Sequence, residues 1–220
     1  MTRELTFKRV APASGTAKSL VVFVHGYGAD GADLLGLADP LAPHLPDTVF
    51  VSVDAPSPCT GNPFGRQWFP IPRFDGSSEV EAAVEMNRAA DDLNSFIDQR
   101  LAAEGLSEAA FGLLGFSQGA MMSLHVAPRR AKAMAGVVAI SGKLMRPQVL
   151  AEEAKVKPPV MLIHGDRDDV VPFGEMQVAG NALVAAGFET FGHVMQGTGH
   201  GIAPDGLGVA MQFLKERLPQ

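Results

Sequence analysis

The sequence has one cysteine and no long apolar run. Cys59 alone cannot form an intramolecular disulfide or a cysteine-based zinc site. No stretch of 18 uninterrupted apolar residues is present, so we expect no membrane-spanning helix. The first nine residues, MTRELTFKR, are charged and lack the apolar segment of a secretory signal peptide. These absences predict a soluble cytoplasmic protein.

Positive charge is also scarce. The chain has 18 Lys and Arg against 24 Asp and Glu, a formal net charge of −6 and a pI near 5.5. Such a chain offers no basic surface for nucleic acid and is poorly suited to an anionic membrane surface. Its 46% of hydrophobic and 19% of charged residues are typical of a globular protein.

Apolar runs alternate with segments of helical period along the chain. We predict strands over residues 5–10, 19–25, 48–53, 110–115, 133–140, 159–164 and 189–195, the first an antiparallel edge strand. A broken helix is expected over 32–44, and further helices over 118–127, 173–186 and 204–218. Strands separated by helices predict an α/β fold with a mostly parallel sheet and helices on both faces. Without a repeat or a linker, we expect one domain over residues 1–220.

The clearest helix signal is the pair Ser78 and Glu81, which predicts a capping box. The helix should end at Gly105. Its expected apolar positions are Val80, Val84, Leu93, Phe96, Ile97 and Leu101.

The segment 55–76 has neither helix nor strand period. It contains five prolines and four aromatic residues, and loops of this length are often functional lids. We hypothesise that Trp68, the only tryptophan, forms part of the wall or lid over the acyl group. The alternative is that Trp68 anchors the loop to the body of the protein. Trp68, Phe69 and Met145 are expected to line an apolar pocket, with simple packing as the alternative.

The pentapeptide GFSQG at 115–119 fits the pattern Gly-x-Ser-x-Gly. It follows an apolar strand and precedes a helix, so a sharp turn should project the Ser117 hydroxyl at the carboxyl end of the sheet. This context predicts a nucleophile. The alternative is a glycine-rich turn with a serine helix cap.

A serine nucleophile needs a base and an acid that orients the base. The strand over 159–164 ends in the carboxylate-rich turn HGDRDDVVP, which makes Asp166, Asp168 and Asp169 candidates for the acid. His200 follows the last strand in a glycine-flanked loop, after both Ser117 and the acidic turn, and is the expected base. A metal site of His164, these aspartates and His200 is the alternative, but it lacks a ligand pair at zincin spacing.

The loop HGYG at 25–28 follows the first buried strand. An oxyanion hole needs two N–H donors, normally one after the nucleophile and one from this earlier loop. We therefore expect the backbone N–H groups of Tyr27 and Gln118 to be the donors. A tight glycine turn without this role is the alternative.

Four segments together resemble the phospholipase/carboxylesterase family of α/β hydrolases, which includes the acyl-protein thioesterases. They are VFVHGYGADGADLLGLA, LLGFSQGAMMSLHV, VMLIHGDRDDVVP and MQGTGHGI, and the resemblance covers nearly the whole chain. It implies a single-domain α/β-hydrolase fold and makes Asp168 the acid. The proline-rich stretch GRQWFPIP departs from the eukaryotic thioesterases and is more similar to bacterial carboxylesterases.

The resemblance implies a serine carboxylesterase acting on short- to medium-chain esters through an acyl-enzyme on Ser117. No cofactor and no metal are expected, and the partner is a small-molecule ester; a homodimer is left open. A lysophospholipase or acyl-(protein) thioesterase with the same triad is one alternative. A catalytically silent ligand-binding homologue is another, since fold does not imply function.

Overall fold

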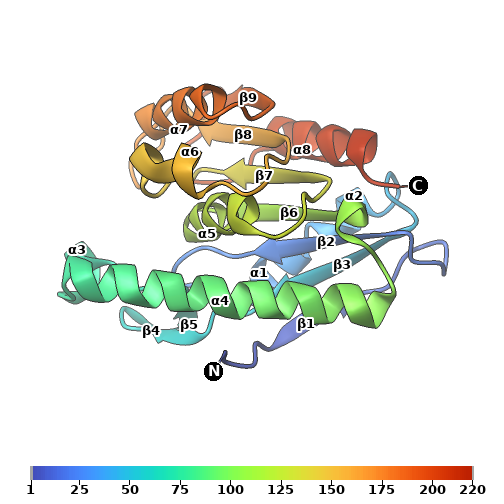
Figure 1. Ribbon diagram of the computed structural model, residues 1–220, viewed down its shortest axis with the longest axis horizontal. Coiled ribbons are helices and arrows are strands. Elements are labelled where there is room, and N and C mark those ends of the chain that lie inside the picture. The colour runs from blue at the N-terminus through green and yellow to red at the C-terminus, as the bar shows by residue number, and fades with distance from the viewer. Residues whose placement is uncertain (1, 220) are drawn as a thin grey trace.

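The computed structural model describes residues 2–219 (Figure 1). Its main strands are β1 (Phe7–Val10), β2 (Ser19–Val24), β3 (Thr48–Val53), β6 (Phe111–Phe116), β7 (Gly136–Ile140), β8 (Val160–Gly165) and β9 (Thr190–Met195). They form one sheet in the order β1-β3-β2-β6-β7-β8-β9. β1 pairs antiparallel with β3, and the other neighbours are parallel. The predicted mostly parallel sheet with an antiparallel edge strand is confirmed.

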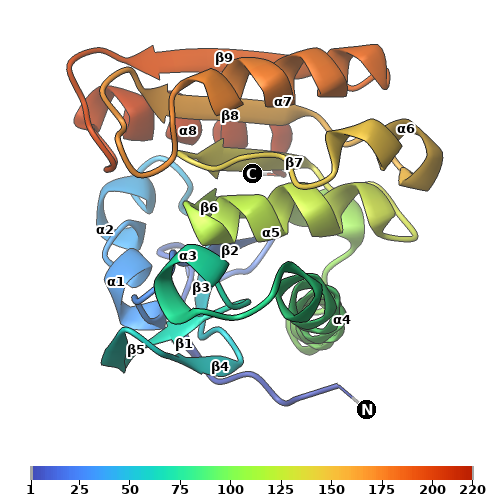
Figure 2. The same cartoon turned by 90° about the vertical axis from the view of Figure 1, so that its left-hand side faces the viewer.

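Helices cover both faces of the sheet (Figure 2). Along β2, alternate side chains point to opposite faces: Leu20, Val22 and Val24 join one core, and Val21 and Phe23 join the other. The first core contains residues of α4, α5 and α7, and the second contains residues of α1, α2 and α8. The helices are α1 (Gly31–Leu35), α2 (Ala38–Leu41), α3 (Pro72–Asp75), α4 (Glu79–Glu104), α5 (Gln118–Val126), α6 (Leu150–Glu153), α7 (Gly174–Ala185) and α8 (Pro204–Arg217).

Helix α4 begins and ends as the sequence predicts. Ser78 Oγ accepts a hydrogen bond from Glu81 N–H at 3.1 Å, and the Glu81 carboxylate accepts one from Ser78 N–H at 2.8 Å. Gly105 ends the helix in the left-handed region, with φ 68°. The prediction that Val80 and Val84 belong to the apolar face of α4 is wrong, because their side chains are 73% and 58% exposed. At 100° per residue Val84 lies nearly opposite the buried Met86 and Leu93, and Val80 lies more than a quarter of a turn away from both.

The segment 55–76 contains regular structure, which corrects the prediction of an irregular loop. β4 (Ser57–Cys59) and β5 (Asn62–Gln67) form an antiparallel hairpin, and α3 follows. An isolated antiparallel bridge joins Arg66 to Ala29. The hairpin therefore lies against the loop that follows β2.

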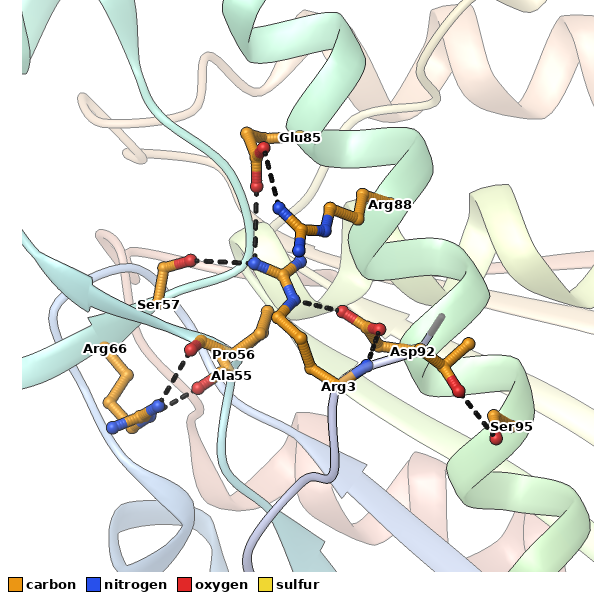
Figure 3. A network of polar contacts seen from close by, with 10 residues as sticks. Arg3, Ala55, Pro56, Ser57, Arg66, Glu85, Arg88, Asp92 and Ser95 are labelled. Atoms are coloured by element: carbon orange, nitrogen blue, oxygen red, sulfur yellow. Dashed lines mark hydrogen bonds and ion pairs between the residues drawn. The ribbon is translucent and has the colours of Figure 1, made fainter.

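Arg3 links this hairpin to helix α4, and Arg66 joins β5 to the residues just before β4 (Figure 3). Arg3 Nη1 donates to Ser57 Oγ at 3.3 Å while the same guanidinium binds α4. Arg66 donates from Nε to the carbonyl of Ala55 and from Nη2 to that of Pro56, the latter at 3.0 Å. Strand β4 is thus tied to α4 through Arg3, and β5 is tied to the start of the segment through Arg66. Among residues 2–219, no helix combines the length and apolar character needed to cross a membrane.

Candidate active site

Ser117 occupies a strained turn between β6 and α5. Its φ of 55° and ψ of −119° lie outside the regions that residues with a side chain normally adopt. The flanking glycines make the turn possible: a Cβ on Gly115 would lie 2.4 Å from the Gly119 carbonyl oxygen, and one on Gly119 would lie 1.9 Å from that of Val24. Ser117 N–H donates to the Ile140 carbonyl at 2.9 Å, which holds the turn against β7.

A chain of two hydrogen bonds joins Ser117, His200 and Asp168. His200 Nε2 lies 2.9 Å from Ser117 Oγ, and His200 Nδ1 lies 2.7 Å from Asp168 Oδ2. The three residues follow the carboxyl ends of β6, β8 and β9, which meet at one edge of the sheet. Ser117 is 8% exposed, and the His200 side chain is 17% exposed. The imidazole therefore adjoins solvent, while the Asp168 carboxylate is fully buried.

Asp168 is held in its ionised form by the turn it sits in. Its Oδ1 accepts hydrogen bonds from Val170 N–H at 3.0 Å and Val171 N–H at 2.9 Å. Burial alone would raise the pKa of Asp168, but the hydrogen bonds from His200 and from these N–H groups lower it below its ordinary value. A carboxylate in this state favours an imidazole that keeps its proton on Nδ1.

The other two aspartates of the turn do not reach His200. Asp166 Oδ1 accepts a hydrogen bond from Gly197 N–H at 2.7 Å, and Asp169 is exposed. Of the three candidates for the acid, the structure brings only Asp168 to the imidazole.

His164 is a buried neighbour of the acid. Its Nε2 donates to the Val171 carbonyl at 2.9 Å and lies 3.3 Å from Asp168 Oδ2. This matches a hydrogen-bonded core histidine, the usual outcome for a histidine on a buried strand. Within residues 2–219, no three His, Cys, Asp or Glu side chains are grouped so that they could hold a metal ion.

The loop after β2 lies directly against the nucleophile turn. A Cβ on Gly26 would come within 3.2 Å of Ser117 Cβ. No acceptor for Tyr27 N–H occurs in the described part of the chain. Gln118 is the first residue of α5, so its N–H has no acceptor within the helix. Neither N–H group therefore has an acceptor among residues 2–219, and their role as oxyanion donors stays a prediction.

The three residues expected to contact substrate have different environments. Trp68 has no exposed surface and Phe69 is 6% exposed, which favours the alternative that Trp68 anchors the segment; contact of either side chain with substrate stays a prediction. The Trp68 ring packs within the core, and its indole N–H donates to the His25 carbonyl in the loop that follows β2. Met145 is partly buried in the segment after β7, and its contact with substrate stays a prediction.

Two features of the site are not apparent from the sequence. The Gln118 side chain bonds to the backbone of Trp68 and Phe69, over a separation of about 50 residues that no local motif reports. Ser141, directly after β7, has a φ of 51° and a fully buried hydroxyl without a hydrogen-bond partner in residues 2–219. The next residue, Gly142, lies so close to the nucleophile turn that a Cβ there would be 3.1 Å from the Ser117 carbonyl oxygen.

Comparison with known proteins assigns the chain. The model of the family Phospholipase/Carboxylesterase matches residues 5–218. The chain belongs to this family. A solved structure shares its architecture: the crystal structure of esterase PE8 superposes with a TM-score of 0.93 at 42% sequence identity, covering 98% of this chain and 100% of that one. The α/β-hydrolase fold expected from the sequence is confirmed.

Two further relatives carry different names. Esterase YpfH of Escherichia coli is 28% identical over 204 residues, which cover 93% of this chain and 85% of that protein. Acyl-protein thioesterase 1 of Saccharomyces cerevisiae is 30% identical over 227 residues, which cover 96% and 97%. The esterase relatives agree with the predicted carboxylesterase, and the chain is a hydrolase of the ester-cleaving type.

Proposed function

We propose that this hydrolase is a serine carboxylesterase with Ser117 as nucleophile, His200 as general base and Asp168 as the acid that orients the base. The observation that carries the proposal is the continuous chain Ser117 Oγ, His200 Nε2, His200 Nδ1, Asp168 Oδ2, with distances of 2.9 and 2.7 Å. A serine hydroxyl is a weak nucleophile until a positioned base takes its proton. Hydrogen-bond distance at both imidazole nitrogens meets that requirement.

In the first half-reaction, Ser117 Oγ attacks the ester carbonyl while its proton passes to His200 Nε2. Asp168 stabilises the imidazolium through Nδ1–H and keeps the ring in the productive tautomer. The negative oxygen of the tetrahedral intermediate accepts hydrogen bonds from the N–H groups of Tyr27 and Gln118. His200 then protonates the leaving alkoxide, the C–O bond breaks and an acyl-enzyme remains on Ser117.

In the second half-reaction, water attacks the acyl-enzyme. His200 Nε2 takes a proton from the water and then returns it to Ser117 Oγ as the tetrahedral intermediate collapses. The products are the carboxylic acid and regenerated enzyme. Each proton transfer in these two half-reactions is made by a side chain of the protein.

The proposed substrates are small carboxylic esters with short to medium acyl chains, in keeping with the esterase relatives. A thioester substrate is a second candidate, favoured by the 30% identity to a protein named acyl-protein thioesterase 1. The same residues would act on either carbonyl. A cytoplasmic location and a homodimer stay predictions.

A panel of p-nitrophenyl esters from acetate to decanoate, one acyl-CoA thioester and one lysophosphatidylcholine tests the proposal. Wild-type protein should turn over the shorter esters best, and Ser117→Ala should lose on the order of 10⁶ in kcat. Turnover of the thioester or the lysolipid above that of every simple ester would assign one of those substrate classes instead. Retention of more than about a tenth of wild-type turnover in Ser117→Ala would reject Ser117 as the nucleophile.

A further inference from the structure

The buried side chain of Gln118 is bonded at both ends to one backbone segment. Its Oε1 accepts a hydrogen bond from Trp68 N–H at 2.8 Å, and its Nε2 donates to the Phe69 carbonyl at 2.8 Å. The residue is 1% exposed, so no solvent replaces these partners. The first residue of α5 is therefore tied to a segment from the far end of the hairpin.

The Trp68 indole ties the same segment to the loop after β2. Its Nε1 donates to the His25 carbonyl at 3.0 Å, and the two rings lie 5.8 Å apart. His25 is fixed in turn: its Nε2 accepts from Ala55 N–H at 2.9 Å, and its Nδ1 donates to the Gly26 carbonyl at 2.8 Å. Burial lowers the pKa of His25, which favours the neutral ring that this pair of bonds requires.

Strand β5 holds the other side of the loop after β2. Gly28 N–H donates to the Arg66 carbonyl at 2.9 Å, and Arg66 N–H donates to the Ala29 carbonyl at 2.8 Å. A Cβ on Gly65 would lie 2.1 Å from the Gly28 carbonyl oxygen, so only glycine allows this approach. Residues 66–69 thus bond to the loop that carries Tyr27 and to the residue that carries the second N–H donor.

We infer that the Gln118 side chain and the Trp68 indole are positioning residues, which set the relative placement of the Tyr27 and Gln118 N–H groups. The inference rests on the proposed function, in which these two groups form the oxyanion hole. Donors aimed at a developing charge act only when neighbouring contacts hold them within about 0.5 Å of the productive geometry. The two donors come from different loops, and residues 66–69 give them a shared support.

Gln118→Met keeps a side chain of similar length but removes both of its hydrogen bonds. Trp68→Phe removes the indole N–H donor but keeps an aromatic ring. We expect each variant to lose about 10- to 100-fold in kcat, less than the 10²–10³ caused by removing a donor outright. KM should change less than about threefold, because substrate binding in the ground state does not use the oxyanion donors. The pH at half-maximal kcat/KM should not move, since His200 and Asp168 keep their contacts.

A trifluoromethyl ketone separates positioning from general loosening of the fold. Ser117 adds to its carbonyl and forms a tetrahedral adduct whose oxygen occupies the oxyanion hole, so its Ki should rise by the factor by which kcat/KM falls. Leu214→Ala is the control, because Leu214 is fully buried in the second core, whereas Trp68 and Phe69 belong to the first. It should lower Tm and leave kcat and Ki unchanged well below Tm.

Rates are expressed per active site, counted by complete reaction with a fluorophosphonate, so that unfolded protein does not contribute. If Gln118→Met does not fold, Trp68→Phe carries the test. The inference is overturned if the folded variants keep kcat within twofold of wild-type, or if Ki and kcat/KM do not change in parallel. Activity surviving in Ser117→Ala would instead reject the proposed function, so the two failures are distinguishable.

Discussion

Asp168 Oδ2 lies 2.7 Å from His200 Nδ1, although 32 residues separate them in the chain. Asp168→Asn would replace an acceptor by an amide and favour the tautomer that carries its proton on Nε2, where it cannot accept the Ser117 proton. We expect kcat to fall by on the order of 10⁴. Steady-state kinetics on a p-nitrophenyl ester measure this.

The neighbouring aspartates supply the controls for Asp168→Asn. Asp169→Asn changes an exposed side chain, and Asp166→Asn changes one that bonds to Gly197 N–H. Both should lose far less activity than Asp168→Asn. A series in which Asp169→Asn is the least active would contradict Asp168 as the acid.

Arg3 and Asp92 form an ion pair whose carboxylate is fully buried (Figure 3). Arg3 Nε donates to Asp92 Oδ2 at 2.6 Å, and Arg3 N–H donates to Oδ1 at 2.6 Å. Arg3→Met leaves the buried Asp92 carboxylate without its charged hydrogen-bond donor, and we expect the free energy of unfolding to fall by about 1.5–3 kcal/mol. Urea denaturation measures it.

The pair of Arg9 and Glu104 is the matched comparison, because the Arg9 side chain is 37% exposed. Arg9→Met should cost only about 0.2–1 kcal/mol. Adding Asp92→Asn to Arg3→Met should recover part of the loss, since no buried charge then remains. An Arg3→Met variant as stable as Arg9→Met would contradict the importance of the buried carboxylate.

His125 links stability to pH. Burial, with a smaller contribution from Arg129, lowers the pKa of His125 to about 4 in the folded protein. The unfolded chain therefore binds the proton more readily than the folded protein. The stability associated with the neutral, buried His125 is fully present above pH 6.5 and is lost as pH falls from about 6.5 to 4. The shift corresponds to about 3 kcal/mol.

His125→Leu should weaken the dependence of unfolding free energy on pH between 7 and 4, although His25, whose pKa burial also lowers, retains its own contribution. His44→Gln, at an exposed position, serves as the control. Denaturant unfolding at several pH values measures the slopes. Equal slopes in His125→Leu and wild-type would contradict the assignment.

The order of strands and helices and the residues around Ser117 could be predicted from local sequence. β2 and β3 are continuous apolar runs, and such runs are typical of strands buried on both faces. The turn at Ser117 follows from a strand, two glycines and a helix in succession. These signals lie within a few residues of one another, so no tertiary contact is needed to interpret them.

The hairpin and the role of Trp68 could not be predicted in the same way. Prolines at 58 and 63 argue against strands, yet a two-stranded ribbon has outer edges where no N–H donor is required. The hydrogen-bond partners of the buried Trp68 are His25 and Gln118, which lie 43 and 50 residues away. A pattern read along one segment does not contain such partners, so an aromatic anchor and an aromatic lid look alike in sequence.

The most direct test of the account is the mass of the protein after reaction with a fluorophosphonate. We predict that wild-type protein gains one phosphonyl group, that peptide mapping locates it on Ser117, and that Ser117→Ala gains none. Loss of ester hydrolysis should follow the modified fraction in direct proportion. Labelling of a different residue, or full esterase activity in protein whose Ser117 is completely modified, would contradict Ser117 as the nucleophile.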